Sequence, residues 1–491
     1  MFSRFLLMAA PLLLLSTMAG AEQRVRPDEL MRHIRVLASD QYEGREPGTA
    51  GGERTEAYLL EAFAQAGLAP GAAGGGWRQV VRMIERRPER SRVSWKAGAR
   101  RLEVPGDALL LVGKEARLRL NDVPVFFAGY GMPGNVEGVD LDNALLLVLG
   151  GNPPGREGAM ELNERMAALA AAGARGVITI VPAAAPWPDV KRAVAAGRAV
   201  PLSRASPLEG AISTVGAASL LRNAGLDLPS LSEEASRPGF RARRLGIDAG
   251  FDVGTAVQAY EAANIIGRIE GNGRAGEAVV LMAHWDHLGL CKPEGEPDRI
   301  CNGAVDNASG TAILIETARA VAAGPRPARS LYFVATTLEE RGLFGADAFA
   351  ASPPPAIERI VAALNIDTAA IAPAGLPVAI IGRGNYPQLD RVIDATARSL
   401  GRGVDTDTEA NVMIERQDGW VLARLNIPAV MASGSVSDMS LLSAYLGGPY
   451  HKPEDDLAQR IELGGAVEDT DLHIALARAL ADPARYPAPR P

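Results

Sequence analysis

Residues that bind metals or form covalent cross-links are scarce in this chain. The 491 residues include only two cysteines, Cys291 and Cys301. Two cysteines cannot build a disulfide scaffold or a cysteine-rich zinc site. There are five histidines, namely His33, His284, His287, His451 and His473. Any metal chemistry must therefore rely largely on carboxylates.

Long apolar runs and basic clusters are also lacking. After the first two dozen residues no apolar stretch is long enough to span a bilayer, which excludes a polytopic membrane protein. The net charge is −7, and a chain without a basic cluster is poorly suited to neutralising phosphates, so we expect no nucleic-acid partner. With 47% hydrophobic residues, the chain is too apolar for disorder. Its length favours two domains, one of them inserted in the other.

The N-terminal segment has the features of an export signal. Residues 1–21 contain Arg4, an apolar core and the small-residue sequence Ala19-Gly20-Ala21, typical of a cleaved signal peptide. An uncleaved anchor is the alternative. We therefore predict a periplasmic or extracellular protein without an integral membrane span after cleavage. In that oxidising compartment Cys291 and Cys301 could pair, although two free buried thiols remain the alternative.

The pattern of strands and helices predicts an α/β fold. Beyond residue 264, apolar strands alternate with amphipathic helices, which indicates a central, mostly parallel sheet flanked by helices. Residues 116–239 form a separate α/β block that contains no histidine. We predict a domain split between residues 22–115 and 240–485, with residues 116–239 inserted. The oligomeric state is not predicted.

Polar residues follow three successive strands of the predicted sheet. His284 and Asp286 follow the first, Glu339 and Glu340 the second, and Asp367 the third. Ligands of such sheets bind beyond the carboxyl ends of the strands. We also expect the side chains of Asp306 and His451 at this edge. Two imidazoles with several carboxylates suit a pair of divalent metal ions, and the mixed nitrogen and oxygen set favours zinc.

Each of these residues also has a structural explanation. Asp306 could cap the helix that follows it, and Glu339 and Glu340 could interact with a helix dipole. His451 alone could be a surface histidine and His284 a core histidine. Their joint occurrence at successive strand ends is what favours a functional site.

Five segments in order resemble the motifs of the M28 family of zinc metallopeptidases, which includes dizinc aminopeptidases. They are VVLMAHWDHLG, NGAVDNASGTA, LEERGLFGADAF, LNIDT and YHKPEDD. The opening LASDQYEGREPGTAGGERTEAYL is similar to the family's N-terminal segment. Residues 116–239 resemble the protease-associated (PA) domain often inserted in that family. The resemblance implies the zinc-exopeptidase fold and peptide substrates.

The resemblance also implies a site with two zinc ions per chain. His284 and Asp367 would hold one ion, Glu340 and His451 the other, and Asp306 would bridge them. A carboxylate bridge suits the separation of about 3.5–4 Å typical of two-metal hydrolytic sites. A water shared by two dications loses protons more readily than bulk water.

Four nearby residues have other implied roles. Asp286 matches the residue that orients the His284 imidazole, and Glu339 matches the general base. Tyr450 could reach a developing oxyanion. The resemblance gives His287 no ligand role, so we expect it to pack or hydrogen-bond near the site.

One departure concerns substrate preference. Relatives carry a histidine after an acidic residue in a segment that lines the substrate cleft, whereas this chain has Gly419 after Asp418. The leading hypothesis is a secreted or periplasmic dizinc exopeptidase, with an aminopeptidase favoured, that uses metal-activated water and a glutamate general base. The alternatives are a carboxypeptidase or dipeptidase, a single-zinc enzyme similar to glutaminyl cyclases, and an inactive receptor-like binding protein.

Overall fold

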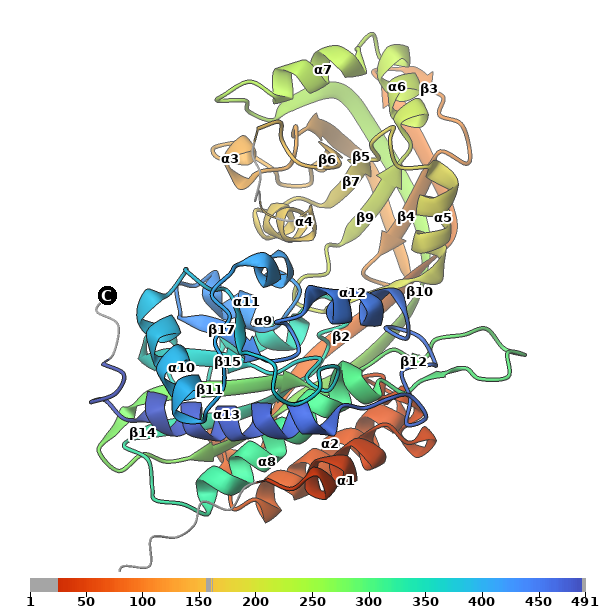
Figure 1. The fold of residues 1–491 in the computed structure, drawn as a ribbon. Helices are drawn as coiled ribbons and strands as arrows, with labels where there is room; N and C mark the ends of the chain where they lie inside the picture. Colours follow the sequence, from red (N-terminus) through yellow and green to blue (C-terminus); the bar gives the residue numbers. More distant parts are fainter. Residues whose placement is uncertain (1–24, 156–159, 161, 488–491) are drawn as a thin grey trace, which may run out of the picture.

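The computed structural model describes residues 25–155, 160 and 162–487. The predicted signal peptide at residues 1–21 lies outside the described residues. Within the described part of the chain, no helix combines the length and the apolar composition that crossing a bilayer requires. The fold contains two groups of strands and helices joined by two long strands (Figure 1).

The first group is built on a mixed sheet. Its strands in spatial order are β16 (Ala379–Ile381), β17 (Ala429–Ser433), β15 (Ile360–Asn365), β11 (Arg274–His284), β14 (Arg329–Thr336) and β10 (Arg243–Ile269). β11 pairs in parallel with β14 and β15, and β15 pairs in parallel with β17. The antiparallel partners β10 and β16 lie on either side of this parallel core. This arrangement confirms the predicted α/β class.

Helices cover both faces of this sheet. Alternate residues of β11 point to opposite faces, so each face presents apolar side chains to its own layer of helices. Val279 and Leu281 pack in one hydrophobic cluster, and Val280 and Met282 pack in another. The helices of the first cluster are α1 (Pro27–Leu37), α2 (Ala50–Gln65), α8 (Gly310–Ala322), α10 (Pro387–Ser399) and α13 (Leu463–Ala481). The second cluster contains α9 (Phe344–Ala351) and α11 (Gly419–Ala423). The parallel core strands are therefore buried on both sides, as their continuous apolar sequences require.

The second group has its own hydrophobic clusters. Its strands in spatial order are β5 (Arg117–Phe127), β6 (Leu145–Leu149), β7 (Gly176–Ile180), β9 (Leu208–Ile212) and β4 (Leu109–Gly113). Its helices are α3 (Pro133–Val136), α4 (Leu162–Ala171), α5 (Trp187–Ala196), α6 (Thr214–Asn223) and α7 (Leu228–Ala235). Figure 1 shows this group at the opposite end of the molecule from α1 and α13.

Two long antiparallel strands join the two groups. β2 (Arg78–Ala97) pairs with β10 from Arg78, opposite Ile265, to Lys96, opposite Asp248. Short strands pair with these two, namely β1 (Ala69–Pro70), β3 (Arg100–Leu102) and β8 (Arg198–Pro201). The buried residues of the second group therefore extend from Trp95 to Val253. The boundaries at residues 116 and 239 stay a prediction, because the chain passes between the groups within continuous strands.

Candidate metal centre

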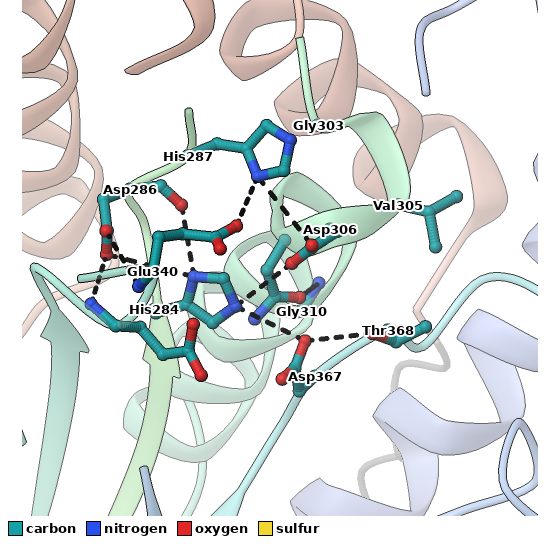
Figure 2. Close-up of polar contacts among 12 residues, drawn as sticks. His284, Asp286, His287, Gly303, Val305, Asp306, Gly310, Glu340, Asp367 and Thr368 are labelled. Atoms are coloured by element: carbon teal, nitrogen blue, oxygen red, sulfur yellow. Dashed lines mark hydrogen bonds and ion pairs between the residues drawn. The ribbon is translucent and has the colours of Figure 1, made fainter. Parts of the chain in front are cut away.

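The ends of three neighbouring parallel strands supply most of the site. His284 is the last residue of β11, Glu339 and Glu340 follow the end of β14, and Asp367 follows the end of β15. Because these strands run in the same direction side by side, their carboxyl ends lie at one edge of the sheet (Figure 2). The side chains predicted to converge there do lie close together.

Asp306 reaches this edge from a short helical turn, Ala304–Ser309, that precedes α8. The peptide bond between Asp306 and Asn307 is cis. The buried carboxylate of Asp455 accepts hydrogen bonds from the backbone amides of Val305 at 2.9 Å and of Asp306 at 3.0 Å. The Tyr445 hydroxyl, on α12 (Met439–Gly447), donates to the same carboxylate at 2.8 Å. The backbone that presents Asp306 is thus held in place from the loop that carries His451.

One cluster of potential ligands consists of His284, Asp306 and Asp367. The His284 Nε2 atom lies 3.3 Å from Asp306 Oδ1 and 3.5 Å from Asp367 Oδ1. One ligand atom from each of the three lies within 4.8 Å of the others. These three side chains could hold one metal ion.

A second cluster lies on the other side of Asp306. The Glu340 carboxylate lies 2.6 Å from His287 Nδ1 and 3.0 Å from His451 Nε2. Asp306 Oδ2 lies 3.3 Å from His451 Nε2 and 3.8 Å from His287 Nδ1. Asp306 therefore offers one oxygen to each cluster, the geometry that a bridging carboxylate needs.

The donor set fits zinc. Asp306 Oδ2 and His451 Nε2 are buried, and although they lie 3.3 Å apart, neither makes a hydrogen bond of suitable geometry among the described residues. Buried polar atoms without a partner are costly unless an ion or another group satisfies them. Imidazole nitrogens combined with carboxylate oxygens are ligands that zinc accepts, whereas magnesium and calcium prefer oxygen alone.

Asp286 is completely buried beneath this edge. Its carboxylate accepts hydrogen bonds from the backbone amides of Glu339 at 3.1 Å and Glu340 at 3.4 Å. The His284 Nδ1 atom lies 3.1 Å from the Asp286 carbonyl oxygen and 3.9 Å from its carboxylate (Figure 2). Asp286 thus ties the segment after β11 to the segment after β14. Burial raises the pKa of its carboxyl group to about 6.

Glu339 belongs to neither ligand cluster. Burial raises its pKa well above the ordinary value, and the nearby carboxylates of Glu340 and Asp418 raise it further, against the opposing effect of His284. Asp418 is itself buried and accepts a hydrogen bond from the Thr336 hydroxyl. Burial raises the pKa of Asp418 to about 7. A carboxyl group with a raised pKa that is not engaged as a ligand is suited to proton transfer.

The remaining predicted residues lie around the site. The Tyr450 ring stacks on His451 with centroids 3.7 Å apart, which restricts the orientation of that imidazole. Cys291 and Cys301 form a disulfide that closes the hairpin of β12 (Gly289–Leu290) and β13 (Ile300–Cys301). This hairpin connects the segment that carries His287 to the turn that carries Asp306.

The other two histidines have structural contacts. His33 is buried between Tyr58, at 2.6 Å, and Glu316, at 3.0 Å. The Nδ1 atom of buried His473 lies 2.7 Å from the carbonyl oxygen of Asp469.

Arg45 is the main residue that the sequence did not reveal. Its side chain is completely buried, and all of its hydrogen bonds go to backbone carbonyl oxygens. They reach Trp285 at 2.8 Å, Gly303 at 2.9 Å and Asp306 at 3.4 Å, together with Leu37 and Asn302. Burial lowers the pKa of Arg45 to about 10, so it stays charged at neutral pH. In the sequence, the only notable feature of Arg45 is that it lies in a glycine-rich loop, and this position does not indicate which groups its side chain contacts.

Comparison with known proteins identifies a similar family and similar folds. Residues 264–476 match the sequence model of peptidase family M28. An aminopeptidase from Aneurinibacillus sp. strain AM-1 shares the fold, with a TM-score of 0.50 and 18% identity over 94% of this chain and 95% of that chain. For the Peptidase M28 precursor from Shewanella amazonensis SB2B, the TM-score is 0.43 and the sequence identity is 17%, over 93% of this chain and 98% of that chain. No curated protein matches the chain.

The family match and the two ligand clusters define the chain as a zinc metallopeptidase, which confirms the class of enzyme that the sequence predicts. Within the chain, residues 264–476 are the part that matches peptidase family M28.

Proposed function

We propose that this metallopeptidase is an exported dizinc aminopeptidase. The observation that carries the proposal is the shared use of Asp306, whose Oδ1 atom faces His284 and whose Oδ2 atom faces His451. His284 and Asp367 would hold one zinc ion, and Glu340 and His451 the other. When bound, zinc polarises the peptide carbonyl and favours deprotonation of a water.

Glu339 is the proposed general base. Its position next to Glu340, outside both ligand clusters, leaves its carboxylate free to take the proton of the attacking water and pass it to the leaving amine. Asp286 would support this arrangement by fixing the amides of Glu339 and Glu340. Tyr450 would restrict His451 through ring stacking and could donate its hydroxyl proton toward a developing oxyanion.

The charges around the site favour recognition of a free N-terminus over a free C-terminus. A carboxypeptidase needs a cation that can bind the terminal carboxylate. Arg45 is committed to backbone carbonyls, and Arg341, which follows Glu340, forms an ion pair with Glu46 at 2.6 Å. The surplus of carboxylates at this edge of the sheet suits a cationic amino terminus. The alternative enzyme is a carboxypeptidase or dipeptidase of the same fold.

A substrate panel tests the proposal. The zinc-loaded protein is given leucine p-nitroanilide, its N-acetyl derivative, and an N-blocked dipeptide with a free C-terminus. We expect hydrolysis of the first compound alone, loss of activity with a chelator, and recovery with zinc. Cleavage only of the N-blocked dipeptide would show a carboxypeptidase, and the absence of any hydrolysis after zinc loading would show an inactive binding protein.

Export and the inserted domain are part of the proposal. Residues 1–21 support export through their charge and apolar core. N-terminal sequencing of the secreted or periplasmic protein should begin near Glu22, and a mature protein that begins at Met1 would contradict cleavage. The assignment of residues 116–239 to a PA-like domain is supported by the parallel strands β5, β6, β7 and β9 and their separate core.

A further inference from the structure

A cavity of about 490 Å³ lies in the second group of strands and helices, away from the metal centre. Leu110, Val112 and Ala211, on the strands β4 and β9, form part of its lining. Val190 and Val194 of α5 form another part. Sites for small molecules in proteins have volumes of about 300–1,000 Å³ and mainly apolar linings. The cavity therefore has the size and surface of a ligand site.

The apolar surfaces around this cavity are incompletely packed. Val190, Ala193 and Val194 have the spacing of an apolar helix face, yet no residue of α5 is buried. Leu110 and Val112 are only half-buried, whereas Leu111, between them, is 3% exposed and packs in the core on the other side of the sheet. Apolar surface left in contact with water costs about 25 cal/mol per Å². An apolar ligand would remove that cost.

Two arginines give the cavity a cationic end. Arg86 on β2 and Arg198 on β8 are directly opposite each other in the antiparallel pair and both line the cavity. Like charges in such positions repel each other. The Arg86 side chain is 1% exposed, and its Nε and Nη1 atoms have no hydrogen-bond partner among the described residues.

A single carboxylate offsets these two positive charges. Glu209 Oε1 lies 2.8 Å from Arg86 Nη2 and also accepts a hydrogen bond from the Ser206 amide at 3.2 Å. Among the described residues, no carboxylate lies within ion-pair distance of Arg198. Arg198 is exposed, whereas Arg86 is buried. One more negative charge would balance this end of the cavity.

We propose that this cavity binds an aliphatic carboxylate, with the aliphatic chain against the apolar lining and the carboxylate between Arg86 and Arg198. Guanidinium groups bind carboxylates through paired, charge-assisted hydrogen bonds. The carboxylate supplies the missing negative charge, and the aliphatic chain covers the exposed faces of α5 and β4. A free fatty acid and the C-terminus of an apolar peptide share this chemistry. This site is separate from the peptidase function and does not depend on it.

Calorimetric titration of the full chain tests the proposal and separates the two sources. Decanoate and 1-decanol form one matched pair, and N-acetyl-Leu-Leu and its C-terminal amide form the other. We expect at least one carboxylate to bind about tenfold or more tightly than its neutral partner, because a hydrogen bond to a charged group contributes about 1.5–3 kcal/mol. Decanoate binding alone identifies a fatty-acid site, and binding of the peptide alone identifies a peptide site. Equal affinity for both members of each pair, or no binding, would overturn the proposal.

Three variants locate the site. Arg198→Gln should weaken carboxylate binding about tenfold and leave binding of the neutral partner unchanged. Ala193→Trp, on the exposed face of α5 that lines the cavity, should abolish both by filling the space. Arg192→Gln is the control, since Arg192 is 78% exposed, pairs with Asp189 and is not part of the lining. Thermal unfolding verifies that each variant folds. Wild-type affinity in both Arg198→Gln and Ala193→Trp would refute the site.

Discussion

Arg45 donates a hydrogen bond from Nε to the carbonyl oxygen of Trp285 at 2.8 Å. Trp285 lies between His284 and Asp286, and other donors of the same guanidinium bind the carbonyls of Gly303 and Asp306. One side chain thus links the backbone next to His284 to the turn that carries the proposed bridging ligand, Asp306. Its planar set of donors allows this, and a lysine cannot reproduce it.

Arg45→Lys should weaken zinc binding. Lysine retains the charge but has fewer donors, so the backbone at Trp285 and Gly303 becomes less restricted. Residues that orient metal ligands typically change metal affinity by about 10–100-fold when altered. Competition with a chromophoric chelator measures the affinity. Arg35→Lys, on the exposed face of α1, is the matched control, and equal zinc affinity in both variants would contradict this role.

Glu339→Gln should lower kcat by about 10²–10⁴-fold, because only the proton acceptor is lost. Zinc content should remain at two ions per chain, since Glu339 is in neither ligand cluster. Metal analysis alongside steady-state kinetics checks both points. Glu340→Gln, the adjacent change, should lose zinc as well as activity. Near-normal kcat in Glu339→Gln would show that another group takes the proton.

His451→Ala and His287→Ala should differ in zinc stoichiometry. His451 Nε2 is close to both Asp306 and Glu340, at 3.3 and 3.0 Å. His287 Nδ1 is close to Glu340, at 2.6 Å, but lies 3.8 Å from Asp306. We expect one ion in His451→Ala and two, bound more weakly, in His287→Ala. The opposite stoichiometry, measured by mass spectrometry of the metals, would make His287 the ligand.

Replacing both Cys291 and Cys301 by serine should reduce the free energy of unfolding by about 3 kcal/mol, the entropic contribution of a cross-link across a short loop. The two cysteines are ten residues apart. Chemical denaturation of the variant, compared with the wild type with and without reductant, measures this loss. If the reduced wild type and the variant were as stable as the oxidised protein, the hairpin would not need the cross-link.

Stability should fall below about pH 6.5, in part because of His473. Burial lowers the pKa of this histidine, so the unfolded chain takes up a proton that the folded chain does not as the pH drops through the ordinary histidine pKa. Folding is then penalised at low pH. The melting temperature of His473→Gln should fall less between pH 7.5 and 5.5 than that of the wild type. An identical fall would assign the pH dependence to other groups.

The sequence by itself determined the class of fold and the residues that meet at the sheet edge. His284, Glu340 and Asp367 follow apolar strands, and parallel strands place their carboxyl ends at one edge, so sequence order alone predicted their proximity. The alternation of strands and helices predicted the layers in the same way. These signals are local, and each can be read from a short segment.

Only the tertiary structure revealed Arg45, the contact between His287 and Glu340, and the paired arginines of the cavity. The partners of Arg45 are backbone carbonyls, which every residue has, so no residue type marks them. Arg86 and Arg198 become neighbours through strand pairing between segments more than a hundred residues apart. Contacts of this kind depend on where distant parts of the chain place the backbone, and that placement is a result of packing the whole fold.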